Sequence, residues 1–231
     1  MTKILAVFFL IFLSSCAKNW SYDGHFGPKN WGNVEEFKFC KIGYNQSPIN
    51  IEGEFKDEDL DFSYSNSEVE KKPTKHLLRL EFDSKDFVLR LKRKYLIRHI
   101  EFHHPSEHLV SSEAHSLEMQ IYHKSDNEQW LALAFFLEVG KENSNFEQLT
   151  KFLAGKENVG KLNLSKIVKE KDKLFFYDGS FTTPPCTEGV KWYVAKTPIT
   201  VSKEQMNQII KLAIFAKTNA RPTQAFHPER F

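Results

Sequence analysis

The sequence predicts a mainly β fold, a single domain with a few short helices at its periphery. Its 231 residues, 41% of them hydrophobic, are enough for one sizeable core and do not require a second domain. From residue 76 onward, short segments alternate apolar and polar residues, which is the period of half-buried strands. Only two segments have clear helical spacing, and no internal repeat is visible. These observations together favour a β-dominated domain.

The first residues are expected to be a targeting segment. Lys3 is followed by the apolar run 4–13, which ends in two serines before Cys16. This arrangement is typical of a signal peptide, and its Leu-Ser-Ser-Cys ending resembles a bacterial lipobox. We expect residues 1–15 to be removed, Cys16 to carry a lipid, and residues 16–231 to form a domain anchored to a membrane of the bacterial envelope. An ordinary signal peptide with an incidental cysteine is the alternative.

Two further cysteines, Cys40 and Cys186, remain in the expected domain. In an oxidising compartment, a lone pair of cysteines most simply forms one disulfide. Such a bond would close a loop of more than a hundred residues, worth roughly 4–5 kcal/mol if chain entropy alone counts. Two free thiols are the alternative.

The regular elements follow in order after an irregular, Trp-rich segment at 17–50, where turn residues recur. Strands are predicted at 78–82, 87–91, 95–103, 117–123, 131–139, 173–177 and 190–195. The nearly unbroken apolar run 131–139 suits a strand buried on both faces. Helices are predicted near 144–153, before Gly155, and after Ser202, which forms a capping box with Gln205.

Charge is distributed unevenly, although the formal net charge is only +2. Residues 52–70 carry eight acidic side chains and one basic one, whereas residues 71–98 carry ten basic and three acidic ones. The basic block could meet a polyanion or a lipid surface. The simpler interpretation is two solvated faces that neutralise each other. A nucleic-acid partner is not indicated.

The segment 98–108 concentrates titratable side chains, with four histidines and two glutamates in eleven residues. Read as a strand, it places His99, Glu101 and His103 on one face. The segment 117–123 alternates in the same way. Polar, titratable groups on an interior strand face usually mark a functional site.

Ordered segments along most of the chain resemble the α-class carbonic anhydrases. They are 20–22 (WSY), 46–51 (QSPINI), 80–83 (LEFD), 103–108 (HHPSEH), 117–118 (LE), 182–189 (TTPPCTEG) and 219–222 (NARP). The resemblance implies a central, mostly antiparallel, twisted sheet of ten strands. It also implies a disulfide between Cys40 and Cys186.

The resemblance further implies a zinc site of three histidines, two at i and i+2 on one strand and one on the neighbouring strand. The corresponding positions here are Glu101, His103 and Gln120, so only one histidine remains. A register shift of one residue would turn every side chain to the other face, and a shift of two would break the flanking matches. Zinc is therefore expected to bind weakly or not at all.

Other family positions are better preserved. Glu107 and Thr182 match the pair that orients the zinc-bound hydroxide, and His76 matches the proton-shuttle position, with a surface histidine as the alternative. Residues expected next to the ligand positions or around the CO2 pocket are His99, Glu118, Tyr122, Ala132, Phe181, Thr183 and Trp192. Tyr122 stands where the family usually has a small branched apolar residue, so we expect it to narrow the pocket, with Ala132 compensating on the facing strand.

Three functions are compatible with these features. The first is a catalytically inactive binding domain, because a zinc hydroxide needs a cation held with an open coordination position. The second is a weak or retuned carbonic anhydrase, since Glu101, His103 and Gln120 can each donate an electron pair. The third is a surface adhesin that binds polyanions through the basic block. We favour the first.

Overall fold

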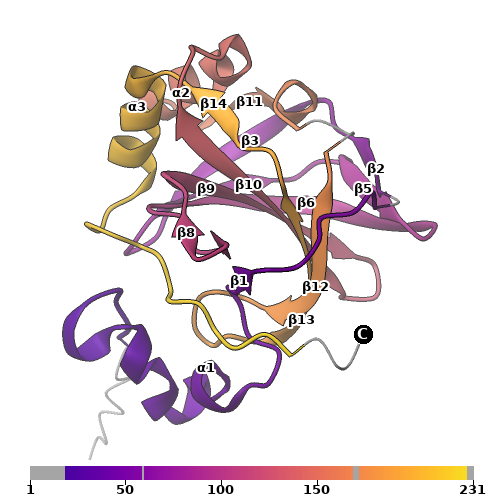
Figure 1. The fold of residues 1–231 in the computed structure, drawn as a ribbon. Helices are drawn as coiled ribbons and strands as arrows, with labels where there is room; N and C mark the ends of the chain where they lie inside the picture. The colour runs from indigo at the N-terminus through magenta and orange to yellow at the C-terminus, as the bar shows by residue number, and fades with distance from the viewer. Residues whose placement is uncertain (1–18, 59, 169–171, 228–231) are drawn as a thin grey trace, which may run out of the picture.

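The computed structural model describes residues 19–58, 60–168 and 172–227, and its main feature is one large twisted sheet (Figure 1). The strands of this sheet are β2 (Leu60–Ser63), β3 (Asn66–Pro73), β4 (Leu78–Phe82), β5 (Phe87–Arg90), β6 (Arg93–His103), β9 (Leu117–Ser125), β10 (Trp130–Val139), β11 (Val159–Asn163), β12 (Leu174–Ser180), β13 (Glu188–Ala195) and β14 (Ile199–Val201). A small second sheet joins β1 (Asn50–Ile51), β7 (Leu109–Val110) and β8 (Glu113–Ala114).

The large sheet has eleven strands within the described residues. Eight of them follow the order β11-β3-β4-β6-β9-β10-β13-β12, β5 links β2 to β6, and β14 pairs with β10. All pairings in this sheet are antiparallel except those of β10 with β13 and with β14. The predicted mainly β, mostly antiparallel fold is confirmed, with one strand more than the expected ten. Strands as short as β14 carry too little alternation to be recognised from sequence.

Short helices lie around the sheet. They are η1 (Gly24–Phe26), η2 (Pro28–Asn33), η3 (Glu35–Phe37), α1 (Phe39–Ile42), η4 (Ser144–Phe146), α2 (Glu147–Ala154), η5 (Leu164–Lys166) and α3 (Lys203–Ala213). The capping box of Ser202 and Gln205 opens α3 as predicted. The described part of the segment 17–50, expected to be irregular, contains three 3-10 helices and the one-turn α1, because its turn residues close short helical turns.

The two faces of the sheet carry different side chains. On β10, Leu133, Phe135 and Leu137 face the core that α2 and α3 cover, whereas Ala134 and Phe136 face the opposite side. A third cluster of Tyr22, Trp31, Phe37, Cys40 and Cys186 packs the N-terminal helices. The helices α2 and α3 lie together at one end of the molecule, and α1 lies at the other (Figure 1). The second face of the sheet is therefore open to the N-terminal segment and the loops.

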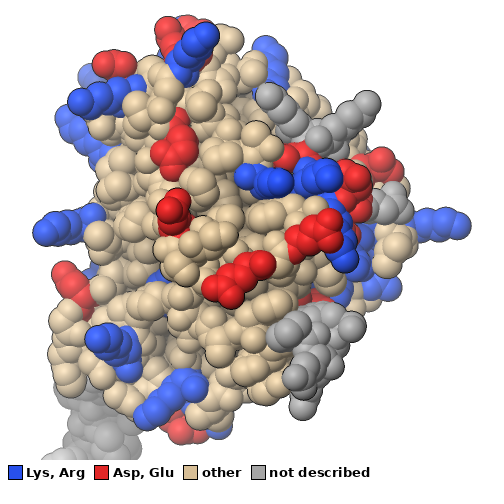
Figure 2. Space-filling view, in the orientation of Figure 1, with Lys and Arg blue, Asp and Glu red and all other residues tan. Residues whose placement is uncertain are grey.

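The acidic and basic blocks of the sequence become neighbouring strands. Strand β2 pairs with β5, which places Leu60 opposite Arg90 and Asp61 opposite Leu89. Strand β3 contains residues of both blocks and pairs with β4. Basic and acidic side chains are interspersed on the face shown in Figure 2. This arrangement suits mutual neutralisation better than a continuous basic face.

The expected targeting segment, residues 1–15 with Cys16, lies outside the described residues. Among the residues that the structure describes, no helix is both long and apolar enough to cross a membrane.

Candidate functional site

The titratable residues singled out from the sequence come together where β6 and β9 run side by side. Three alternate residues of β6 share one face, and each lies opposite a residue of β9. The pairs are His99 with Tyr122, Glu101 with Gln120, and His103 with Glu118, and all six residues are buried. The alternation expected from the sequence is confirmed, and the three candidate ligand positions are neighbours.

His103 is the only histidine among these three positions. Its Nδ1 lies 2.7 Å from the backbone oxygen of Asn219, to which it donates, and its buried Nε2 has no hydrogen-bond partner. Nε2 lies 3.7 Å from Oε2 of Glu101, and Nδ1 lies 3.4 Å from Oε1 of Glu107. Burial alone would lower the pKa of His103, but the two carboxylates outweigh burial and raise this pKa to about 9. The imidazole is therefore held as a cation.

Glu101 is bound by an arginine of the neighbouring strand. Nε of Arg79 lies 2.7 Å from Oε1 of Glu101, and Nη2 donates to the same oxygen. Because Leu80 pairs with Ile100 in the antiparallel register, Arg79 on β4 stands directly across from Glu101. Burial alone would raise the pKa of Glu101, but His103 and Arg79 outweigh it and hold that pKa well below its usual range. The carboxylate therefore stays ionised.

Gln120 has every polar atom of its side chain engaged. Its Nε2 donates to Oε2 of Glu107 at 2.9 Å and to Oε1 of Glu118 at 2.8 Å. Its Oε1 accepts a hydrogen bond from the Tyr122 hydroxyl at 2.7 Å. The carboxamide is therefore fixed in one orientation, with its nitrogen toward the two carboxylates.

The two buried carboxylates differ in their surroundings. Glu118 accepts hydrogen bonds from the backbone N–H groups of Glu107 and His108, and its Oε1 lies 2.7 Å from Nδ1 of His108. Burial alone would raise the pKa of Glu118, but His108 outweighs it and lowers this pKa to about 2. Glu107 accepts from the backbone N–H of Arg221 at 2.8 Å, and burial raises its pKa against the opposing effect of His103.

Two hydroxyls at the site are buried without a hydrogen bond of ordinary geometry, those of Thr182 and Tyr22. The Thr182 hydroxyl is nevertheless close enough to lower the pKa of both Glu107 and Tyr122. The pKa of Tyr22 is raised by burial and then by Glu107 and Glu101. The site is thus a buried polar centre built around carboxylates, the imidazoles of His99, His103 and His108, and the guanidinium of Arg79.

The family model of the eukaryotic-type carbonic anhydrases matches residues 26–229. The chain belongs to the carbonic anhydrase family. It is 31% identical to a carbonic anhydrase of Neisseria gonorrhoeae over 89% of this chain and 84% of that protein. It is also 31% identical to dioscorin DB3L of Dioscorea polystachya over 86% of this chain and 79% of that protein.

Solved structures agree with this assignment. The α-carbonic anhydrase of Thermovibrio ammonificans, solved with the inhibitor sulfanilamide, superposes with a TM-score of 0.80 at 30% identity, covering 90% of this chain and 96% of that one. Dioscorin solved with ascorbate superposes with a TM-score of 0.80 at 27% identity, covering 90% and 94% of the two chains.

The carbonic anhydrase family implies a zinc ion held by three imidazoles, and the donors present here do not fit one. Nε2 of His103 has no hydrogen-bond partner, but the two neighbouring carboxylates hold this imidazole protonated, whereas a zinc ligand must be neutral. Glu101 is instead held by the guanidinium of Arg79, and Gln120 presents its carboxamide, a poor zinc ligand, already bonded to three side chains. Among the described residues, no cluster of three or more His, Cys, Asp or Glu side chains is arranged to hold a metal ion.

The residues predicted to surround a CO2 pocket form a cluster of aromatic rings. The Tyr122 ring stacks on His99 with centroids 4.7 Å apart and on Phe181 at 5.6 Å, and Trp192 meets it edge-on at 5.7 Å. Ala132 lies directly opposite Tyr122 in the register of β9 and β10. Its small side chain leaves room for the phenol. Thr183, also expected here, is half-buried in the loop before Cys186.

His76, predicted to occupy the proton-shuttle position, is not on the surface. It is buried, its ring packs 4.2 Å from that of Trp20, and its Nε2 lies 2.9 Å from the Trp20 carbonyl oxygen. Burial lowers its pKa. The alternative of a surface histidine is wrong, and a shuttle role would require this ring to leave Trp20.

The expected disulfide of the carbonic anhydrase family is present between Cys40 and Cys186. It joins α1 to the loop that carries Thr182. The buried Arg221 supports the same region, since its guanidinium donates to the backbone oxygens of Cys40 and Ser47. The N-terminal segment is therefore fastened beside the site.

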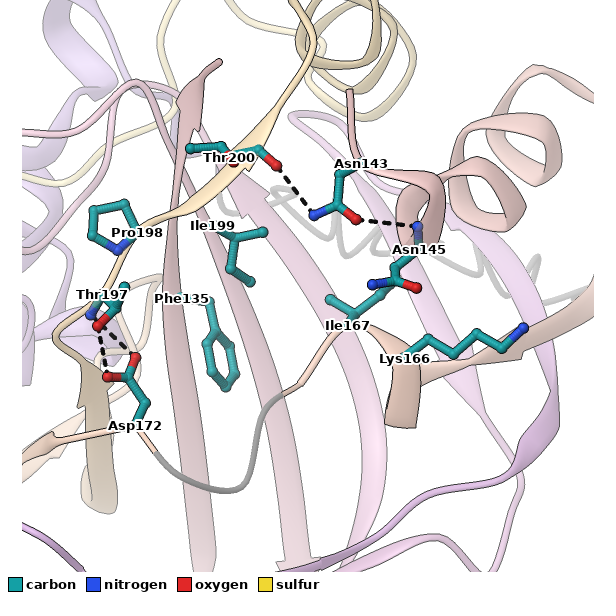
Figure 3. A pocket seen from close by; sticks show the side chains of 10 residues that line it. All are labelled: Phe135, Asn143, Asn145, Lys166, Ile167, Asp172, Thr197, Pro198, Ile199 and Thr200. Carbon is teal, nitrogen blue, oxygen red and sulfur yellow. Dashed lines mark hydrogen bonds between the residues drawn. The ribbon is translucent and has the colours of Figure 1, made fainter. Parts of the chain in front are cut away.

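A cavity of about 350 Å³ lies on the other face of the sheet (Figure 3). Phe135 of β10 forms its floor, and Asp172, bound to Thr197, lies at its rim. On β9, Met119 is opposite Phe135 and faces away from Gln120. This cavity is therefore separate from the carbonic-anhydrase-like site.

Sequence reasoning counted Arg79 only as part of a basic block, whereas the structure places it at the centre of the site. A usable signal was present. An acidic residue at a buried ligand position needs a compensating cation. Pairing the predicted strand 78–82 with the predicted strand 95–103 would have identified Arg79 as this cation.

Proposed function

We propose that this chain is a carbonic anhydrase family member that does not hydrate CO2 and acts as a binding domain. The proposal is based on the partners of two residues at the expected zinc-ligand positions. Glu101 is paired with Arg79, and Gln120 is hydrogen-bonded to two carboxylates and a phenol. A zinc hydroxide requires a cation held by protein ligands with one position open. One imidazole beside a bound carboxylate does not supply such a site.

The aromatic filling supports the same conclusion. Tyr122 hydrogen-bonds Gln120 and stacks between His99 and Phe181 in the region where CO2 would have to approach. Displacing a buried phenol would break this hydrogen bond and the ring contacts together. Substrate access is therefore opposed independently of the metal.

The test uses purified protein lacking residues 1–15, dialysed and then given equimolar zinc. We expect bound zinc well below one equivalent and CO2 hydration at the uncatalysed rate. The carbonic anhydrase of Neisseria gonorrhoeae, treated identically, is the positive control. Stoichiometric zinc together with hydration that acetazolamide inhibits would refute the proposal.

A weak or retuned carbonic anhydrase is the second candidate, and one observation favours it. His103 donates through Nδ1 to Asn219 and leaves Nε2 unpartnered, which is the orientation of a metal-binding imidazole. Glu107 and Thr182 are also retained beside it. In the same assay, this candidate predicts zinc-dependent hydration that His103→Ala abolishes.

For its location, we propose export and attachment to a membrane through a lipid on Cys16, as the lipobox-like sequence predicts. The partner would then be met in the cell envelope, as a protein or a polyanion. We do not favour the polyanion. Several bases of the 71–98 block have internal partners: Lys71 donates to the backbone oxygens of Phe152 and Gly155, Arg90 bonds Tyr193, and Arg93 bonds Gln129.

A further inference from the structure

A row of three side chains crosses the centre of the sheet. Arg79 on β4, Glu101 on β6 and Gln120 on β9 stand at the same level of three adjacent strands, because the registers of β4 with β6 and of β6 with β9 coincide at Glu101. Side chains directly opposite one another on one face of a sheet interact most strongly. In this row, two family ligand positions are thus followed by an arginine on the third strand.

We infer that Arg79 takes the electrostatic place of the metal ion and excludes divalent cations from this site. Its guanidinium donates twice to Oε1 of Glu101, whose side chain is 3% exposed. An ionised carboxylate buried this far needs a nearby cation. Arg79 supplies that cation permanently, since a guanidinium does not lose its proton in proteins.

The arrangement also accounts for the remaining polar groups. His103 Nε2 points to the other oxygen of Glu101 at 3.7 Å, so the carboxylate lies between a guanidinium and an imidazole. A metal ion bound through His103 would have to displace the Arg79–Glu101 pair or approach a fixed positive charge. Arg79 is about one-third exposed, with 33% of its side chain accessible, so it approaches Glu101 from the solvent side.

This inference rests on the proposed loss of zinc, and its first test restores the missing ligands. We compare the double variant Glu101→His/Gln120→His with a triple variant that adds Arg79→Gln. Each is titrated with Co²⁺, whose binding is monitored by its visible absorption spectrum, and then with Zn²⁺. The triple variant is expected to bind both ions at least ~10-fold more tightly, because charge repulsion at short range in a partly screened site is removed. Arg98→Gln in place of Arg79→Gln is the matched control and should leave the affinity of the double variant unchanged.

Equal affinities of the double and triple variants would overturn the inference while leaving the proposed function intact. CO2 hydration by the unmodified protein that acetazolamide inhibits, together with stoichiometric zinc, would instead refute the proposed function. The two failures are therefore distinguishable.

A second measurement covers the case in which the double variant does not fold. Urea unfolding midpoints are compared for Arg79→Gln, Glu101→Gln and both together, with Arg98→Gln as the control. If Arg79 compensates Glu101, the combined variant loses less than the sum of the two single losses, because neither charge is left unpaired. Additive losses would overturn the inference.

Discussion

His123 illustrates how burial in this protein changes the pKa of an ionisable side chain. It lies on the site strand β9 but faces the other side of the sheet, where its Nε2 lies 2.8 Å from the Tyr64 hydroxyl. It is fully buried, and burial lowers its pKa to about 3. The native protein therefore keeps this imidazole neutral, whereas the nearby His103 is held as a cation by two carboxylates. The protonation states differ because carboxylates offset the burial of His103, whereas none offsets the burial of His123.

The pKa of His123 predicts acid sensitivity. In the unfolded chain, His123 takes up a proton near pH 6.5, whereas in the native protein it stays neutral down to about pH 3. The unfolded state binds more protons in this window, so the free energy of unfolding falls as pH decreases through it, by a few kcal/mol at most. His123→Gln, which can still accept from Tyr64, should flatten this dependence in urea unfolding measured from pH 7 to pH 4.

The exposed His25→Gln is the control and should keep the original pH dependence. Part of the dependence will persist in His123→Gln, since burial also lowers the pKa of His99, to about 4. A His123→Gln curve with the slope of the unmodified protein would show that this histidine is not the cause.

At the level of elements, the hairpin of β5 and β6 is closed by a turn with an unfavourable sequence. Arg90 pairs with Arg93, so only Leu91 and Lys92 form the loop, with φ angles of 46° and 63°. Two consecutive positive φ values define the type I′ turn, which favours Asn-Gly. Leu91 is also 69% exposed. The turn therefore lowers stability at the start of the strand that carries the site.

Replacing this pair with Leu91→Asn/Lys92→Gly should stabilise the protein by about 0.5–1 kcal/mol, because both residues adopt positive φ at little steric cost. Thermal unfolding followed by circular dichroism measures the change. Leu91→Thr is the control: it also removes the exposed leucine, but its branched side chain disfavours positive φ and should reduce stability. A stabilisation by Leu91→Thr equal to that of the double variant would attribute the effect to lost hydrophobicity instead.

For the whole molecule, the disulfide is the longest-range covalent connection. Cys40 and Cys186 are 146 residues apart in sequence, and both lie in the cluster of Tyr22, Trp31 and Phe37. This cluster holds the N-terminal helices against the loop of Thr182. The disulfide thus keeps the N-terminal helices in place next to the loop that carries Thr182.

Removing this bond is expected to cost roughly 2–5 kcal/mol of unfolding free energy, mainly because the unfolded chain regains entropy. Urea unfolding with and without reductant should show this loss. Cys40→Ala/Cys186→Ala should resemble the reduced protein and no longer respond to reductant. A reductant effect of equal size in that double variant would point to a cause other than the disulfide.

How much of this could be read from the sequence depends on the range of the interactions. Alternation over five or more residues identified β4, β6 and β9, a nearly unbroken apolar run identified β10, and a local capping box identified α3. Seven of the described strands, β1, β2, β3, β7, β8, β11 and β14, were not predicted, because their pairing depends on distant partners and not on local periodicity.

The sequence by itself determined the family, the mainly β fold and the pairing of the two cysteines, since each is written in residue identity and order. Only the tertiary structure decided which side chains surround Glu101 and Tyr122. Arg79 reaches Glu101 because two registers coincide, and the Tyr122 ring has room because β10 places Ala132 opposite it. Such contacts join residues far apart in sequence, so their energies depend on strand pairing that composition and periodicity do not specify.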